Sequence, residues 1–165
     1  MNAVMEFEKR LERAIERGQQ ARHVQGRLAA ERALSEDDLK SLHTSCRLEL
    51  SDHIESLLRH LADRFPGFQF ETIVGKEGWG AKITRDDIAR DRSRGFQTLY
   101  SRLLLVVSPF SDAHIVALTA KGTIRNKETV SRNHFQYLSQ VDIYSFRELI
   151  DLWVLEYAES YAATA

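Results

Sequence analysis

Residues 98–130 read TLYSRLLLVVSPFSDAHIVALTAKGTIRNKETV and contain the most apolar run of the chain, Leu103 to Val107. The run is short, ends in β-branched valines and is soon followed by Pro109, so it predicts a strand rather than a helix. The residues from Pro109 to Asp112 are typical of a turn, because proline fixes one backbone angle and aspartate can bond the neighbouring main chain. The stretch therefore predicts a strand that turns back on itself.

The second half of this stretch predicts two more strands. Residues 114–120 form the return strand, and Lys121-Gly122 is the expected two-residue turn, because glycine accepts the positive backbone angle of a tight hairpin. Residues 123–130 then complete an antiparallel meander. Residues 135–141 could add a final strand.

Both faces of the first of these strands are apolar. Side chains alternate across a strand, so Leu103, Leu105 and Val107 face one side while Leu104 and Val106 face the other. An antiparallel sheet with one wet face shows clean alternation, so this strand is expected to be covered on both sides. We expect the C-terminal helix to cover one face of the sheet, and the first two helices or a partner subunit to cover the other face.

Three helices are predicted around the sheet. Residues 3–34 form the first, since apolar or small residues recur there at near-heptad spacing. They are Val4, Phe7, Leu11, Ala14 or Ile15, Gly18, Ala21 and Leu28. A second helix is expected to begin after Ser35, whose side chain can cap it, and to stop at Pro66-Gly67. A third is expected to begin at the capping box Ser145-Phe146-Arg147-Glu148.

Two further strands are predicted before the meander, at residues 68–74 and 79–83, with glycine-rich turn residues between them. The connection at residues 84–95 is long and densely charged, so it is read as either a short helix capped by Thr84 or a mobile flap. The predicted fold class is α+β, with an N-terminal helical hairpin, an antiparallel meander of four to five strands and a C-terminal helix packed on the sheet. Residues 1–65 are the hairpin, a possible oligomerisation arm, and residues 66–165 form one continuous domain with it.

Composition limits the classes of protein that this chain can be. With 43% hydrophobic and 28% charged residues in 165, it is ordinary globular material, and its net charge of −1 points to no polyanionic partner. Cys46 is the single cysteine, so no intrachain disulfide can form and a reducing compartment is expected. No apolar run approaches the roughly 18 residues of a membrane span, and no export signal is evident. We expect a cytoplasmic protein.

Motifs that carry standard enzyme chemistry are not found in the sequence. It has no phosphate-binding loop, dinucleotide fingerprint, H-E-x-x-H, G-x-S-x-G or paired C-x-x-C, and Gly75 to Gly80 is read as a turn. His43, Cys46, Glu49 and His53 have helical spacing that could gather metal ligands, but a buried structural thiol is the better reading of Cys46. We expect no cofactor and no metal.

Other candidate residues also have simple structural readings. His114 and Asp112 could form an acid/base dyad, but they are better explained as residues at a turn. The carboxylates from Asp86 to Asp91 alternate with arginines, which favours a salt-bridged surface over a cation site. Trp79 has the same strand parity as Ala81 and Ile83, which favours a core position over an exposed stacking residue.

The leading hypothesis is a non-enzymatic protein-interaction or assembly domain whose partner is a second copy or another protein. Its proposed oligomer seam is Phe7, Leu11, Ile15 and Leu28, on the thin first helix. One alternative is a nucleic-acid-binding protein that uses Arg17, Arg22, Arg27, Arg125 and Lys127 for phosphate contacts. The other is a small-ligand binder or enzyme with a cleft beside the sheet, gated by residues 84–95.

Overall fold

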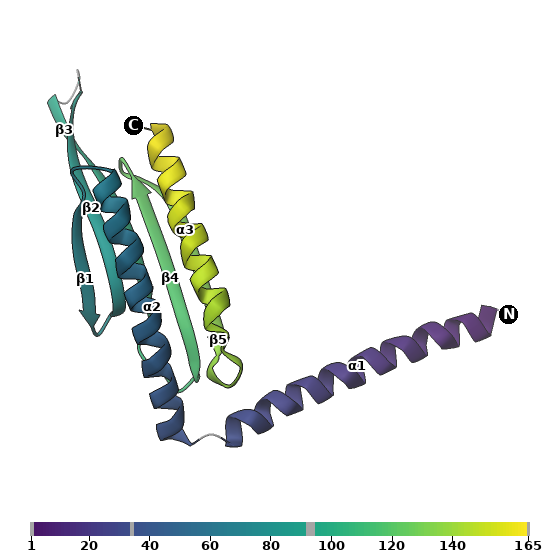
Figure 1. Cartoon of the computed structure of the whole chain (residues 1–165). Helices are drawn as coiled ribbons and strands as arrows, with labels where there is room; N and C mark the ends of the chain where they lie inside the picture. The colour runs from purple at the N-terminus through teal and green to yellow at the C-terminus, as the bar shows by residue number, and fades with distance from the viewer. Residues whose placement is uncertain (1, 34, 92–94, 165) are drawn as a thin grey trace.

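The computed structural model describes residues 2–33, 35–91 and 95–164 as three long helices and one five-stranded sheet (Figure 1). The strands are β1 Gln69–Gly75, β2 Gly78–Asp91, β3 Gly95–Val107, β4 Ile115–Ile124 and β5 Lys127–Tyr137. They pair in chain order, and every pair is antiparallel. The predicted α+β class and the predicted meander are therefore confirmed.

The helices are α1 Asn2–Ala33, α2 Glu36–Arg64 and α3 Ile143–Thr164, with a short 3-10 turn, η1 Leu138–Gln140, before α3. Figure 1 shows α2 and α3 side by side on one face of the sheet, while α1 runs away from the sheet as a separate rod. We call α1 the arm, and residues 36–164 the body. Ser35 caps α2 as predicted, since its hydroxyl accepts a hydrogen bond of 3.1 Å from the amide of Asp38.

The core lies between the sheet and the two packed helices. On β3, the side chains of Leu103, Leu105 and Val107 are fully buried, as alternation across the strand predicts. Ile54 and Leu58 of α2 are also fully buried against this face. The predicted C-terminal helix also covers this face of the sheet. Its buried residues are Phe146, Ile150, Trp153, Val154, Tyr157 and Tyr161.

The second face of the sheet is not covered by α2, because α2 packs on the same face as α3. Leu104 and Val106, which point to the opposite side of β3, are half-buried. The arm, for its part, contacts η1 rather than lying across the strands. The apolar second face predicted from the sequence exists, but the described helices leave it open.

The turn predicted at Lys121-Gly122 is wrong. β4 continues to Ile124, and the turn is made by Arg125 and Asn126, whose φ angles are 48° and 70°. Asparagine tolerates this left-handed conformation, and the Asn126 side chain also bonds β3, accepting from the Tyr100 amide at 2.8 Å. Gly122 instead lies under the ring of Tyr157, where a Cβ atom would be 2.8 Å from Tyr157 Cδ2. The glycine is there for a close approach, not for a turn.

The connection predicted at residues 84–95 is also different in the structure. β2 runs on to Asp91 and pairs with the first half of β3, so that Asp86 lies opposite Tyr100 and Ile88 opposite Thr98. Neither a helix nor a loop is present over residues 84–91. The segment was not recognised as a strand because both of its faces carry charge, which hides the alternation that a half-buried strand shows.

The final elements differ from the prediction by a few residues. β5 runs unbroken from Lys127 to Tyr137 and residues 138–140 form η1, so residues 135–137 end this strand and no separate strand is present at 135–141. α3 begins at Ile143, two residues before the predicted cap at Ser145. Asp142 is the residue that caps it, since its carboxylate accepts from the Tyr144 amide at 3.1 Å.

Candidate interaction surface on the arm

The predicted seam residues of α1 are exposed along the whole helix. Phe7 is 62% exposed, Leu11 41%, Ile15 51% and Leu28 37%. Val4, Met5 and Val24 on the same helix are exposed as well. Large apolar side chains that lie on one helix and remain in water are typical of a surface that meets a partner. The structure thus places all four seam residues on an open helix face.

The arm contacts the body only near its C-terminal end, as far as its described side chains show. The guanidinium of Arg27 lies over the ring of Tyr137, 4.0 Å from the ring centre. Arg27 is also the one side chain of the described part of α1 that is half-buried rather than exposed. Gln140 of η1 lies beside Gly26 and Arg27 in a shallow hollow. This joint holds one end of the arm and leaves its first four or five turns without support from the body.

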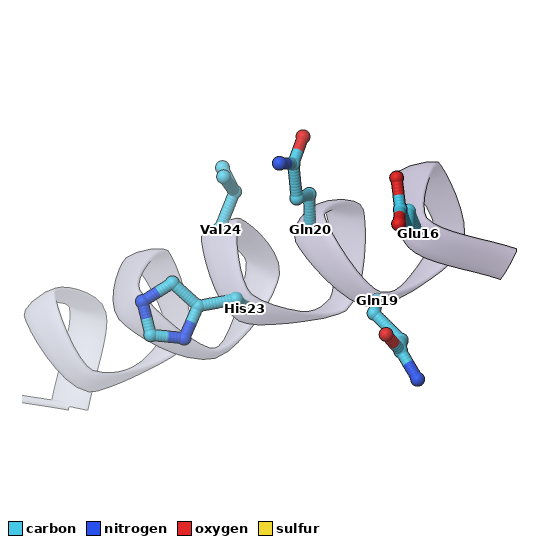
Figure 2. A pocket seen from close by; sticks show the side chains of 5 residues that line it. All are labelled: Glu16, Gln19, Gln20, His23 and Val24. Atoms are coloured by element: carbon cyan, nitrogen blue, oxygen red, sulfur yellow. The ribbon is translucent and has the colours of Figure 1, made fainter. Parts of the chain in front are cut away.

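A second hollow lies on the arm itself and is drawn in Figure 2. Its volume is about 440 Å³, and it is lined by Glu16, Gln19, Gln20, His23 and Val24. All five residues belong to α1, so the hollow has a wall on one side only. Ligand sites normally enclose most of a small molecule's surface. This hollow is the side of an unpartnered helix.

The five basic residues proposed for nucleic acid do not form one patch. Arg17 and Arg22 are exposed on the arm, and Arg27 stacks on Tyr137. Arg125 lies in the turn before β5 and Lys127 is the first residue of β5, whereas Tyr137 is the last residue of this 11-residue strand. At about 3.3 Å per residue, the two groups are separated by roughly 33 Å along the strand. A single short nucleic-acid duplex bound on one face would therefore not contact both groups of basic residues.

The helical candidates for a metal site face different surroundings. Cys46 is buried in the core, and burial, with a smaller effect from Glu49, raises the pKa of its thiol. His43 is buried beside it and bonds the carbonyl oxygen of Ser108 at 3.1 Å. Burial lowers the pKa of His43, because the charged imidazolium would lose its water. Among the described residues, no group of three or more His, Cys, Asp or Glu is placed to hold a metal ion.

The other candidate histidines join elements of the body to each other. His114 does not pair with Asp112; its Nε2 is 2.9 Å from Glu36 Oε2, which links the start of β4 to the start of α2. His53 Nε2 is 2.7 Å from Asp151 Oδ1, which links α2 to α3. Both contacts are ones that hold a fold together.

Two of the remaining charged and aromatic candidates, Asp87 and Trp79, have partners in the structure. Asp87 accepts from Arg85 at 2.9 Å, and Arg85 also donates to the carbonyl oxygen of Pro66 at 2.7 Å. Asp86 is exposed and, one residue away on the strand, points to the opposite face from Asp87. The side chain of Asp91 lies outside the described residues. Trp79 is half-buried, with the guanidinium of Arg47 4.2 Å from its ring centre.

Sequence reasoning did not identify two further apolar surfaces. One is a groove of about 340 Å³ between the C-terminal part of α2 and the second half of α3, lined mainly by apolar side chains that include Leu57, Phe65 and Leu155. The other is the exposed pair Ile88 and Phe96 on the outer ends of β2 and β3, which are 74% and 77% exposed. The apolar stripe on α3 is wider than contact with the sheet alone requires, and this width could have predicted the groove. The second was hidden because residues 84–95 were predicted to be a connection.

Comparisons with known proteins do not identify this chain. No protein family, no curated protein and no solved structure matches it. None of the described helices is long and apolar enough to cross a membrane. The exposed surfaces of the molecule are therefore what can indicate its function.

Proposed function

We propose that this chain is a non-enzymatic assembly domain that associates with further copies of itself through the arm. The observation that carries the proposal is the exposure of Phe7, Leu11, Ile15 and Leu28 on a helix of 32 residues. A helix of this length in a domain as small as the body normally buries its apolar stripe against the rest of the domain. This one has its stripe in water over most of its length.

The stability of the arm gives a second reason to expect a partner. Helices in proteins owe most of their stability to packing of an apolar face, because nucleation is costly and isolated helices are marginal in water. Gly18 and Gly26 each cost roughly 1 kcal/mol relative to alanine inside a helix. A Cβ atom added at either glycine would meet nothing within 4 Å among the described residues, so neither position needs glycine for a close approach within the chain. A partner that buries the stripe would supply the missing packing.

The chemistry of the body supports a structural role over catalysis. Three of its histidines, His43, His53 and His114, bond a backbone carbonyl or pair with a carboxylate of another element. The segment predicted to gate a cleft is residues 84–95, and its residues 84–91 belong to strand β2. These three histidines thus join separate elements of the body to one another.

The test is the molar mass of the purified chain, measured by size-exclusion chromatography with light scattering over a hundredfold range of concentration. We expect an oligomer that becomes a monomer in the Leu11→Glu variant, since a carboxylate would be buried in the interface. Gln20→Glu is the matched control, because it adds the same charge about 130° round the helix from the apolar stripe and should leave the mass unchanged. A wild-type monomer at all concentrations contradicts the proposal, and an oligomer that survives Leu11→Glu places the interface elsewhere.

The same experiment distinguishes the nucleic-acid alternative. The ratio of absorbance at two ultraviolet wavelengths reports whether nucleic acid travels with the protein. If it does, binding should weaken steeply with salt and fall when Arg17 and Arg22 are changed to glutamine. An oligomer that elutes without nucleic acid supports self-assembly.

A further inference from the structure

We propose that two arms pair antiparallel, as a two-stranded coiled coil centred on Glu16; this inference rests on the proposed function and gives it a geometry. Three of the four seam residues, together with other residues of the same helix face, fall into two series with seven-residue spacing. The series are Val4, Leu11, Gly18 and Gln25, and, three positions later, Phe7, Ala14, Ala21 and Leu28. They correspond to the a and d positions of a heptad.

The two series match each other when one helix is reversed. In an antiparallel coiled coil, an a residue of one helix lies across from a d residue of the other. Opposite residues then have numbers that add to 32, which places the twofold axis at Glu16. The four resulting layers are Val4 with Leu28, Phe7 with Gln25, Leu11 with Ala21, and Ala14 with Gly18, and each occurs twice in the dimer.

Side-chain size favours this arrangement over a parallel one. In the antiparallel register, Leu11 lies across from the small Ala21, and the small pair Ala14 and Gly18 lets the two helices approach closely at the centre. In a parallel dimer in register, Gly18 would lie across from Gly18 while Phe7 met Phe7. That dimer would be too wide at one end and would have an empty layer in the middle, and interiors are packed without such voids.

Charge favours the same arrangement. Glu8, Ile15 and Arg22 lie seven residues apart on one flank of the seam. Reversing one helix puts Glu8 across from Arg22 on both sides of the twofold axis, with Ile15 meeting Ile15 between them. A parallel pair instead places Arg22 beside Arg17 twice. Antiparallel pairing has one unfavourable contact of this kind, between the two copies of Arg17, against two favourable ones.

The joint with the body leaves this seam free. Arg27 points toward Tyr137, and Leu28 and Gln25, which belong to the two heptad series, are turned about 100° and 160° away from it round the helix. Antiparallel pairing also separates the two bodies, since the two copies of Leu28 would lie about 36 Å apart along the axis. In a parallel dimer both bodies would have to fit at the same end of the coil.

Cysteine cross-linking tests the direction of pairing in the full chain. The variants are Leu11→Cys and Ala21→Cys, and their masses differ, so intact mass spectrometry identifies every linked species. After mixing and mild oxidation we expect a disulfide between the two different variants, because these positions share a layer. Each variant alone should stay unlinked, since its own cysteines lie ten residues apart along the coil. The wild type, with Cys46 buried, is the control.

Each failure has a distinct meaning. Self-linked Leu11→Cys overturns the antiparallel arrangement and indicates a parallel one. A wild-type dimer in which the mixture gives no linked species overturns the register centred on Glu16. A monomeric wild type overturns the proposed function itself.

Charge reversal gives an independent readout that needs no new cysteine. Arg22→Glu should raise the dissociation constant of the dimer by about tenfold, because two attractive pairs become repulsive, and the added Glu8→Arg change should restore it. A parallel dimer would respond in the opposite direction, because the new carboxylate would then lie beside Arg17. Analytical ultracentrifugation of the three proteins measures the change, and a tighter Arg22→Glu dimer would contradict the inference.

Discussion

The body and the arm both carry long apolar helix stripes, but only the body buries them. In α2, Leu50, Ile54 and Leu58 are fully buried against the sheet, whereas in α1 Phe7 is 62% exposed and Leu11 41%. Both stripes are visible in the sequence at helical spacing. Spacing therefore predicts that a helix has an apolar face, but not whether that face is covered by the same chain.

The size of the residues in the two stripes is what separates them. The α2 stripe has a leucine or isoleucine at nearly every turn, as at Leu50, Ile54 and Leu58, and it can fill the wide space above a sheet. The α1 stripe has Ala14, Gly18 and Ala21 at its middle. Small residues leave voids against a sheet but suit a close approach between two helices. The first stripe is suited to the body, and the second to another helix.

The largest expected difference between the two regions comes from introducing the same charge into each. Leu105→Asp places an unpaired carboxylate at a fully buried position of β3, which costs several kcal/mol and should abolish cooperative unfolding. Leu11→Asp lies on the arm and should leave the unfolding transition of the body in place. Thermal melts followed by near-ultraviolet circular dichroism compare the two. Cooperative melting of Leu105→Asp would mean that β3 is misplaced.

Two glycines sharpen the comparison through packing. Gly122→Ala should destabilise the body by about 1–3 kcal/mol, because the new methyl group would press on the buried ring of Tyr157. That ring cannot easily move, since the Tyr157 hydroxyl donates to the Thr123 carbonyl at 2.9 Å. Gly18→Ala meets nothing within 4 Å in the arm and should increase helicity instead. Urea denaturation measures the stability of the Gly122→Ala body, and far-ultraviolet circular dichroism measures the helicity of the Gly18→Ala arm. Two changes in the same direction, both stabilising or both destabilising, would contradict the account.

The junction between the regions depends on the cap of α2. Ser35→Ala removes the hydroxyl that accepts from the Asp38 amide and should cost about 1 kcal/mol of body stability. Ser35→Asp keeps an acceptor in place and should retain most of it. Urea midpoints of the three proteins give the answer; a Ser35→Ala protein as stable as the wild type would show that the cap contributes little.

The smallest expected effect is a pH dependence that belongs to the body alone. Burial lowers the pKa of His43 below its ordinary value of 6.5, so the unfolded chain takes up a proton first as the pH falls. This contribution to stability is present above pH 6.5 and is lost below it. His43→Gln can still donate to the Ser108 carbonyl but does not titrate, so its stability should fall less between pH 7.5 and 5.5. Equal slopes for both proteins would contradict this assignment.

Much of the body could be predicted because its signals are local and agree with each other. The run Leu103 to Val107, the cap at Ser35 and the glycine turn between β1 and β2 all lie where the sequence predicted them. The turn at Arg125-Asn126 was missed because Gly122 was the stronger local signal. What required glycine there was the ring of Tyr157, 35 residues further along the chain. Contacts of that kind cannot be seen in local sequence.

The strand ends and the arm show two other limits. Residues 84–91 extend β2 although both of their faces are polar, because pairing with β3 is backbone hydrogen bonding and needs no apolar pattern. The seam residues of α1 form an apolar series in the sequence, and the structure places them in water. Under the proposed function these residues contact a second copy of the chain. Neither the sequence nor the structure of one subunit can show that contact.

Hydrogen exchange as a function of protein concentration tests the central claim most directly. We expect the amides of residues 3–29 to exchange quickly in dilute protein and slowly in concentrated protein, because a lone exposed helix is marginal and its partner is a second copy. The amides of Leu103 to Val107 should be protected equally at every concentration. Protection of residues 3–29 that does not change with concentration would contradict the account.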